Sequence, residues 1–155
     1  TTRNATSHGM NAYFDNPDQW ELFKRDRPGT AVDEILRWAT PVHAFQRTAT
    51  RDTQLGGIDI AKGDRAGLFY SSANFDEDVF DDPFSFNILR DPNPHLSFGI
   101  GEHFCLGAQL ARLEAQTVFT EVLRRWPDYR VLDGVRMGPS TLLRETAELP
   151  ILLAP

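Results

Sequence analysis

A glycine-rich segment around the only cysteine, followed at once by an apolar helical run, constrains this chain more than any other feature. The segment reads FGIGEHFCLG over residues 98–107, with the cysteine at position 105. Glycine adopts positive φ and lets a flat ligand approach the backbone closely. A helix that begins just after Cys105 places N–H donors and partial positive charge near the sulfur, which favours the thiolate. A thiolate is in turn a strong ligand for a single metal centre.

Three interpretations of Cys105 compete when only the residues are considered. The first is a buried free cysteine that packs as a small apolar side chain in a tight turn. The second is a nucleophile assisted by His103, although no Asn or Asp that would orient this histidine is evident. The third is the thiolate ligand of a haem iron. A zinc site is disfavoured because the histidines show no paired ligand spacing, and a dinucleotide fingerprint fails because Phe104 stands where Gly or Ala is needed.

The composition narrows the setting and the partners. One cysteine cannot form an internal disulfide, which fits a reducing, cytoplasmic compartment. The 16 basic and 22 acidic residues give a net charge of −6, which argues against nucleic acid as a partner. No apolar run is long enough for a transmembrane helix, so no membrane span is expected. The sequence starts at Thr1 without Met or a signal-peptide pattern, so we expect a piece of a longer protein.

Helical patterns dominate the first third of the chain and return after the cysteine. Asn16 is predicted to cap a short helix that starts at Pro17. Thr30 opens a capping-box-like spacing for a second helix, expected over residues 30–39. A third helix, expected over residues 106–125, is apolar most of the way round, and this predicts burial on nearly all sides.

The remaining segments predict short strands and one long loop. Residues 75–94 are rich in Asp, Pro and Phe without periodicity, so they are predicted to form a loop pinned by aromatic side chains. Runs of β-branched and aromatic residues, one of them with a Gly56-Gly57 turn inside it, predict strands over 44–50, 54–60, 66–70 and, as an edge strand, 149–153. The predicted fold class is α+β, mainly helical, with small antiparallel sheets.

A second constellation lies upstream of the cysteine. Glu34 and Arg37 are three residues apart on a predicted helix, so they share a face and form an ion pair. Most such pairs are solvated and contribute little. More informative is the order of these residues along the chain. The pair comes first, Arg90 follows it, and Cys105 comes last.

This order of motifs resembles the cytochrome P450 family. Glu34-x-x-Arg37 is similar to the family's helix motif, and Arg90 to the arginine that completes a buried triad with it. Residues 98–107 fit the family's haem-binding signature at every defining position. The resemblance runs the whole length of the chain. It implies that residues 1–155 are the C-terminal portion of a single P450 domain whose N-terminal portion is absent.

The resemblance implies a haem cofactor (heme b) and a set of residues around it. Cys105 resembles the thiolate ligand of the iron, and Phe98 the residue that shields its sulfur. Arg47 and His103 resemble positions that hold the haem propionates, and Thr1 resembles the distal threonine that organises water beside dioxygen. The other implied positions are Gly99 and Gly107 of the cofactor loop, the structural triad Glu34, Arg37 and Arg90, and a substrate pocket of Val42, His43, Ala44, Phe45 and Leu142.

The implied function is haem-thiolate monooxygenation, in which O2 and two electrons serve to hydroxylate an apolar substrate. The runs 38–41 and 69–76 are similar to actinobacterial members that hydroxylate the end of a sterol side chain, and related members act on branched lipids. The implied electron donor is a ferredoxin, docking near Cys105 against Arg112, Arg124 and Arg125. The alternative is a truncated, non-catalytic haem-binding or interaction fragment, and we expect the isolated chain to be inactive.

Overall fold

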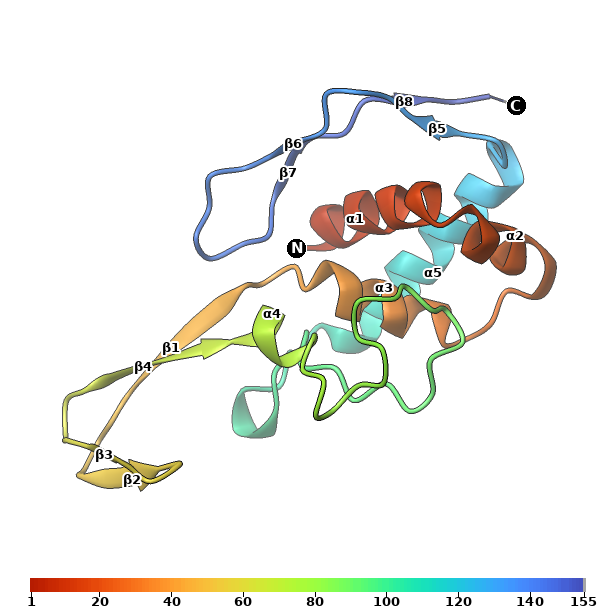
Figure 1. Cartoon of the computed structure of the whole chain (residues 1–155). Coiled ribbons are helices and arrows are strands. Elements are labelled where there is room, and N and C mark those ends of the chain that lie inside the picture. Colours follow the sequence, from red (N-terminus) through yellow and green to blue (C-terminus); the bar gives the residue numbers. More distant parts are fainter. Residues whose placement is uncertain (155) are drawn as a thin grey trace.

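The computed structural model describes residues 1–154 and shows a helical body from which a long β-hairpin arm projects (Figure 1). The predicted fold class, mainly helical with small antiparallel sheets, is confirmed. The helices are α1 (Thr2–Asp15), α2 (Pro17–Asp26), α3 (Ala31–Ala39), α4 (Tyr70–Ala73) and α5 (Ala108–Arg125), with a 3-10 turn over Gly101–His103. None of the helices in the described part is long and apolar enough to span a membrane.

Four antiparallel strand pairs make up the β structure. The arm consists of one pair continued by a second pair, and the other two pairs lie over α1 (Figure 1). The pairs are β1 (Ala44–Thr48) with β4 (Arg65–Phe69), β2 (Thr53–Leu55) with β3 (Ile58–Ile60), β5 (Arg130–Val131) with β8 (Ile151–Leu152), and β6 (Arg136–Met137) with β7 (Thr146–Glu148).

The predicted strands correspond to β1, to β2 with β3, to β4 and to β8, whereas β5, β6 and β7 were not predicted. The strand expected over 54–60 is a hairpin, because Gly56 and Gly57 both adopt positive φ, 58° and 79°, and reverse the chain between β2 and β3. Positive φ at two successive positions is the conformation that a two-residue hairpin turn requires. The edge strand expected near the C-terminus is β8, which pairs only with β5. The loop over 75–94 contains no helix or strand, as predicted.

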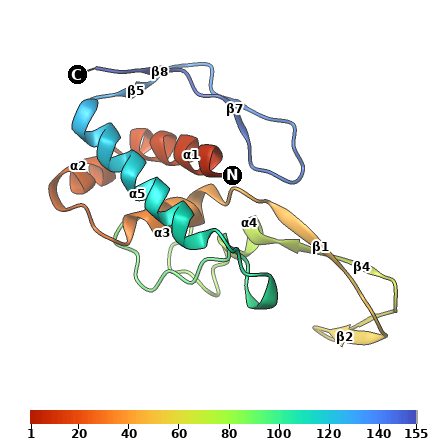
Figure 2. The ribbon, with the colours of Figure 1, turned by 180° about the vertical axis from the view of Figure 1, so that it is seen from behind.

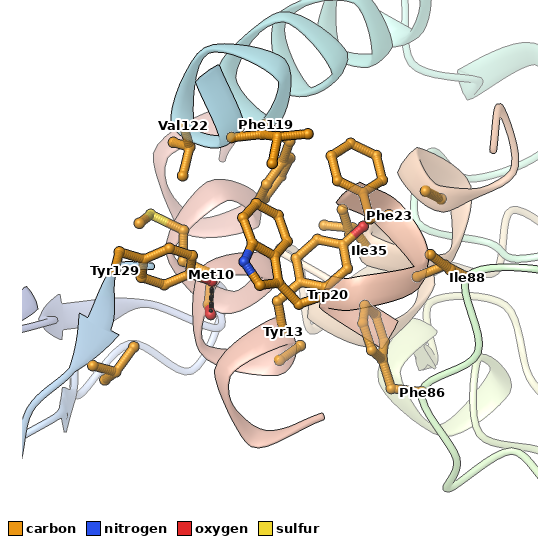
Figure 3. Close-up of a cluster of buried hydrophobic side chains, with 14 residues drawn as sticks. Met10, Tyr13, Trp20, Phe23, Ile35, Phe86, Ile88, Phe119, Val122 and Tyr129 are labelled. Atoms are coloured by element: carbon orange, nitrogen blue, oxygen red, sulfur yellow. Dashed lines mark hydrogen bonds between the residues drawn. The ribbon is translucent and has the colours of Figure 1, made fainter. Parts of the chain in front are cut away.

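The core lies where α5 crosses α1 and α3 (Figure 2). Tyr13 stands at its centre, with its ring within 5.0–5.6 Å of four other rings. These rings belong to Trp20, Phe23, Phe86 and Phe119, and Figure 3 shows them together with the Tyr129 hydroxyl, which donates to the Met10 carbonyl at 2.6 Å. Such edge and tilted arrangements add to the stabilisation from burial.

Asn16 and Thr30 are the N-cap residues of α2 and α3, as predicted, but neither side chain caps its helix by a hydrogen bond. The Asn16 side chain donates to the Ala12 carbonyl at 2.8 Å, at the C-terminus of α1, while the Asn16 backbone carbonyl accepts from the Gln19 and Trp20 N–H groups of α2. The Thr30 hydroxyl donates to the Ile88 carbonyl at 2.6 Å, so it fastens the 75–94 loop to the start of α3. In both places a carbonyl outside the expected helix competes successfully for the side chain.

Within the described residues α5 is buried on one side only. Ala115, Phe119 and Val122 are buried against α1 and α3. Leu110 and Leu113, on the opposite face, are each 60% exposed, and Leu106 before the helix is fully exposed. Within residues 1–154 no other segment covers this face. The helix therefore has apolar side chains on both faces, but only one face is buried.

Candidate functional site

The glycine-rich loop folds back on itself and leaves the cysteine open. Gly99 and Gly101 have φ values of 72° and 74°, which only glycine adopts without strain. These two turns allow the Cys105 N–H to donate to the Phe98 carbonyl at 2.9 Å. Cys105 is thereby placed just ahead of α5, exposed and with a free thiol. The interpretation of Cys105 as a buried structural thiol is therefore wrong.

Cys105 opens onto a cavity of about 700 Å³ between the loop, α1, α5 and the base of the hairpin arm. The loop supplies one wall and the first turn of α1 another. The residues that line the cavity are Thr1, Thr2, Ala5, Leu36, Pro41, Val42, Phe45, Arg47, Tyr70, Ser97, Phe98, Gly99, His103, Cys105, Gly107, Leu110, Ala111, Glu114 and Ala115. The set is mostly apolar, with Arg47 from β1, His103 from the loop and Glu114 from α5 among its polar members.

The structure thus brings most of the implied cofactor and pocket positions to one cavity. Those on its lining are Thr1, Val42, Phe45, Arg47, Phe98, Gly99, His103, Cys105 and Gly107. His43, Ala44 and Leu142 are not on it. Ala44 is the first residue of β1, and its side chain points to the opposite face of the strand from that of Phe45, which lines the cavity. The His43 Nδ1 atom lies 3.1 Å from the Ser71 hydroxyl. The backbone N–H of His43 donates to the Leu142 carbonyl.

The lining residues fit a haem. Gly99 and Gly107, both on the lining, leave backbone without side chains near the cysteine, which suits a flat macrocycle. Arg47 and His103 are suited to bind carboxylates through charge-assisted hydrogen bonds. Within residues 1–154 no three His, Cys, Asp or Glu side chains gather as a metal cluster. Cys105 therefore offers a single protein ligand, as suits a metal that a porphyrin already holds.

A buried ionic cluster lies behind the loop. Glu34 accepts two hydrogen bonds from Arg37, at 2.8 and 2.9 Å, and one from Arg90 at 3.2 Å. Both Glu34 and Arg37 have no exposed surface, and Arg90 is 8% exposed. Glu34 also accepts from the Asn87 N–H and from the Asn93 amide, so its charge is fully compensated. The pairing expected for these three residues is present.

The ionic cluster holds the 75–94 loop by its backbone. Arg37 donates to the carbonyls of Asn74 and Pro83 at 2.8 and 2.9 Å and to that of Ser85 at 3.2 Å. Its guanidinium also lies 5.0 Å from the centre of the Phe75 ring. Arg90 also donates to three carbonyls of this loop, so a loop without secondary structure is ordered through two buried cations.

Asn74 is a positioning residue that the sequence analysis did not single out. Its amide donates to the Thr40 and Ser97 hydroxyls, both at 2.9 Å, and accepts from the Leu96 N–H at 2.7 Å. Ser97 in turn donates to the Leu36 carbonyl at 2.7 Å. The fully buried amide thus ties the root of the cysteine loop to the end of α3. No hydrophobic pattern signals such a residue, because its partners are polar and far away in sequence.

The three arginines expected on a docking surface differ from one another. Arg112 is turned inward: Nε donates to Asp33 at 2.9 Å, and the guanidinium lies 4.8 Å from the centre of the Phe98 ring. Arg124 and Arg125 are more than half exposed, and both pair with Glu121. Hydrogen bonds first from Arg124 and then from Arg125 lower the pKa of Glu121 to about 2.

Comparison with known proteins identifies the fold that carries this cavity. Residues 30–131 match the family model described as Cytochrome P450. This chain belongs to the cytochrome P450 family. The family expected from the motifs is therefore confirmed, and with it the kinship to actinobacterial steroid-hydroxylating P450s.

Individual P450s match this one closely over a part of their length. A steroid C26-monooxygenase of Rhodococcus jostii (strain RHA1) is 57% identical over 152 residues, which are 97% of this chain and 32% of the relative. A steroid C26-monooxygenase of Mycolicibacterium smegmatis is 58% identical over 131 residues, 84% of this chain and 31% of the relative. The crystal structure of CYP109E1 from Bacillus megaterium in complex with testosterone has a TM-score of 0.93 and 32% identity, over 99% of this chain and 43% of that one. The chain therefore spans about a third of the length of the curated relatives that it matches.

Proposed function

We propose that this chain is the haem-binding portion of a monooxygenase that hydroxylates the end of a steroid side chain. One observation carries the proposal: the only cysteine opens onto a cavity whose other walls are the first turn of α1 and apolar side chains of α3, β1 and α5. A haem bound by a cysteine thiolate supplies the activation of dioxygen, because the thiolate pushes electron density toward the metal.

The chain's own residues have separate tasks in this proposal. Cys105 binds the iron through its thiolate. Arg47 and His103 hold the two propionates by charge-assisted hydrogen bonds and so fix the orientation of the ring. Thr1, at the N-cap of α1, holds a water and relays a proton through its hydroxyl. Phe98, on the cavity lining beside Cys105, keeps water from the sulfur.

The apolar lining determines the class of substrate. Val42, Phe45 and Leu36 offer no hydrogen-bonding side chains, so they favour a hydrocarbon and exclude water. The relatives are named for a steroid and its C26 position, and the B. megaterium structure contains testosterone. These names support a steroid that is hydroxylated at the end of its side chain.

Electrons for the reaction come from outside the chain. We assign a ferredoxin-type donor, docking near Cys105. Arg124 and Arg125 are exposed, but they lie in the last turn of α5, at the opposite end of the helix from Cys105. A low-potential donor and a reactive free thiol both fit a reducing cytoplasmic setting.

Absorption spectroscopy tests the cofactor half of the proposal. The chain is mixed with haem, reduced and exposed to carbon monoxide, beside the Cys105→Ser variant. We expect a red-shifted, thiolate-type Soret band that the variant lacks. Equal spectra for the two proteins would contradict Cys105 as the ligand.

A chimera tests the catalytic half. The part of this chain that aligns with the R. jostii relative replaces the matching third of that relative, and steroid hydroxylation is measured with a ferredoxin system. We expect product in the chimera and none in its Cys105→Ser form. A chimera that shows the thiolate spectrum but forms no product would favour the alternative, a non-catalytic haem-binding fragment. The exposed Leu106, Leu110 and Leu113 are the observation behind this alternative, since they offer an interaction surface.

A further inference from the structure

The Phe98 ring, beside the cysteine, is caged by three neighbours of which one is a cation. The Arg112 guanidinium lies 4.8 Å from its centre, the His95 ring 5.9 Å and the Phe104 ring 6.1 Å. Phe98 and Cys105 are joined through the backbone, where the carbonyl of the first accepts the N–H of the second at 2.9 Å. Whatever fixes the Phe98 ring therefore acts next to the sulfur.

Asp33 fixes the cation over the ring. Its Oδ1 accepts from Arg112 Nε at 2.9 Å and lies 3.1 Å from His95 Nε2. The hydrogen bond from His95 and then that from Arg112 hold the pKa of Asp33 below its usual value, so the carboxyl is charged near neutral pH. One carboxylate on α3 thus orients two of the three neighbours of Phe98.

Arg112 is less available to a partner than the other arginines of α5. Its side chain is 31% exposed, against 61% for Arg124 and 53% for Arg125. An arginine that binds a partner protein needs an exposed guanidinium. Arg112 instead donates from Nε to Asp33 and stacks its planar guanidinium on Phe98, and lysine could not make both contacts.

We propose that Arg112, oriented by Asp33, is a positioning residue that holds Phe98 against the cysteine loop and raises the reduction potential of the bound haem. The inference rests on the function proposed above. A cation over an aromatic face is attracted by the ring quadrupole. Reduction adds negative charge to the iron–thiolate unit, so a cation held nearby stabilises the reduced form. Asp33 acts mainly through the orientation that it gives to Arg112, and this effect outweighs the direct effect of its own negative charge.

A double-mutant cycle on the haem-free chain tests the clamp itself. Unfolding in urea is measured for Arg112→Gln, Phe98→Leu and the double variant. We expect the fold-change in the unfolding constant of the double variant to be about threefold smaller than the product of the two single fold-changes. Arg112→Lys replaces Arg112→Gln if the latter does not fold. Changes that simply multiply would overturn the proposal.

Spectroelectrochemistry on the haem-loaded chain tests the consequence. For Arg112→Gln we expect at least a threefold lower equilibrium constant for reduction, about 30 mV for one electron. Arg25→Gln is the matched control, because it removes the same charge from an exposed pair with Asp26 on α2 and should not shift the potential.

Asp33→Ala separates positioning from simple charge. Loss of a nearby anion alone would raise the potential, whereas release of Arg112 from the ring lowers it, and we expect the lower value. A rise, or an unchanged potential in Arg112→Gln beside an intact thiolate spectrum, overturns this inference alone. A wild-type chain that shows no thiolate spectrum overturns the proposed function and this inference with it.

Discussion

The two sides of α3 differ in burial and in pairing. On one side Glu34 and Arg37 sit in a cluster with no exposed surface, where every charge has a partner. On the other side Leu36 faces a cavity whose key residue, Cys105, is exposed and unpaired. Burial of charge is tolerated only when it is fully compensated, whereas a ligand site needs an atom left free. The comparison therefore separates residues that stabilise the fold from residues that serve the cofactor.

The largest effect should come from breaking the ionic side. Glu34→Gln keeps the shape of the side chain but leaves Arg37 and Arg90 buried without an anion. We expect a loss of about 3–5 kcal/mol in the free energy of unfolding, measured by urea titration. Glu21→Gln is the control, since its pair with Lys24 is exposed and should matter little. Similar losses in the two variants would contradict the distinction between the clusters.

Asn74 connects the two sides, so its removal should affect both. In Asn74→Ala the Leu96 N–H and two hydroxyls lose their partner. We expect a loss of about 1–3 kcal/mol in stability. We also expect a smaller fraction of thiolate-type carbon monoxide complex, because the root of the cysteine loop is released. A full thiolate spectrum in this variant would show that the loop is positioned without Asn74.

Acid should weaken the link between α3 and the loop through Asp33. Its pKa is lowered, first by the His95 hydrogen bond and then by Arg112. A carboxyl with a lowered folded-state pKa contributes stability that is complete above its unfolded pKa, about 3.9, and is lost as the pH falls through the folded value. We therefore expect Asp33→Asn to flatten the decline in unfolding free energy between about pH 5 and pH 2.5. Parallel curves for the two proteins would contradict this contribution.

The smallest effect on stability should come from the residue that matters most for function. Cys105 is exposed, so Cys105→Ser changes no buried contact. We expect a change within about 0.5 kcal/mol in the free energy of unfolding of the haem-free chain. The same substitution should abolish the thiolate spectrum. A strongly destabilised serine variant would return Cys105 to a structural role.

The sequence predicts the two sides unequally well. Glu34, Arg37, Arg90 and Cys105 were found because their order resembles a family motif, and the structure places the first three in contact. Local signals placed Asn16 and Thr30 correctly at the helix starts but did not predict that their side chains bond to the carbonyls of Ala12 and Ile88.

Other features escaped prediction because they depend on tertiary contacts. The roles of Asn74 and Asp33 rest on partners more than 20 residues away, which periodicity and propensity do not register. The exposed face of α5 escaped for the converse reason. An apolar pattern predicts burial, but it does not say which segment covers each side.

The hydrogen bonds of Asn74 also bear on how sequences of this kind diverge. Its two N–H groups and its oxygen are all used, by Thr40, Ser97 and Leu96. A residue without a hydroxyl at position 97 or at position 40 would leave one buried N–H of the Asn74 amide without an acceptor. The hydrogen bonds therefore make positions 40, 74 and 97 depend on one another. Substitution at any one of them should be found together with substitution at the others, although they lie on separate segments of the chain.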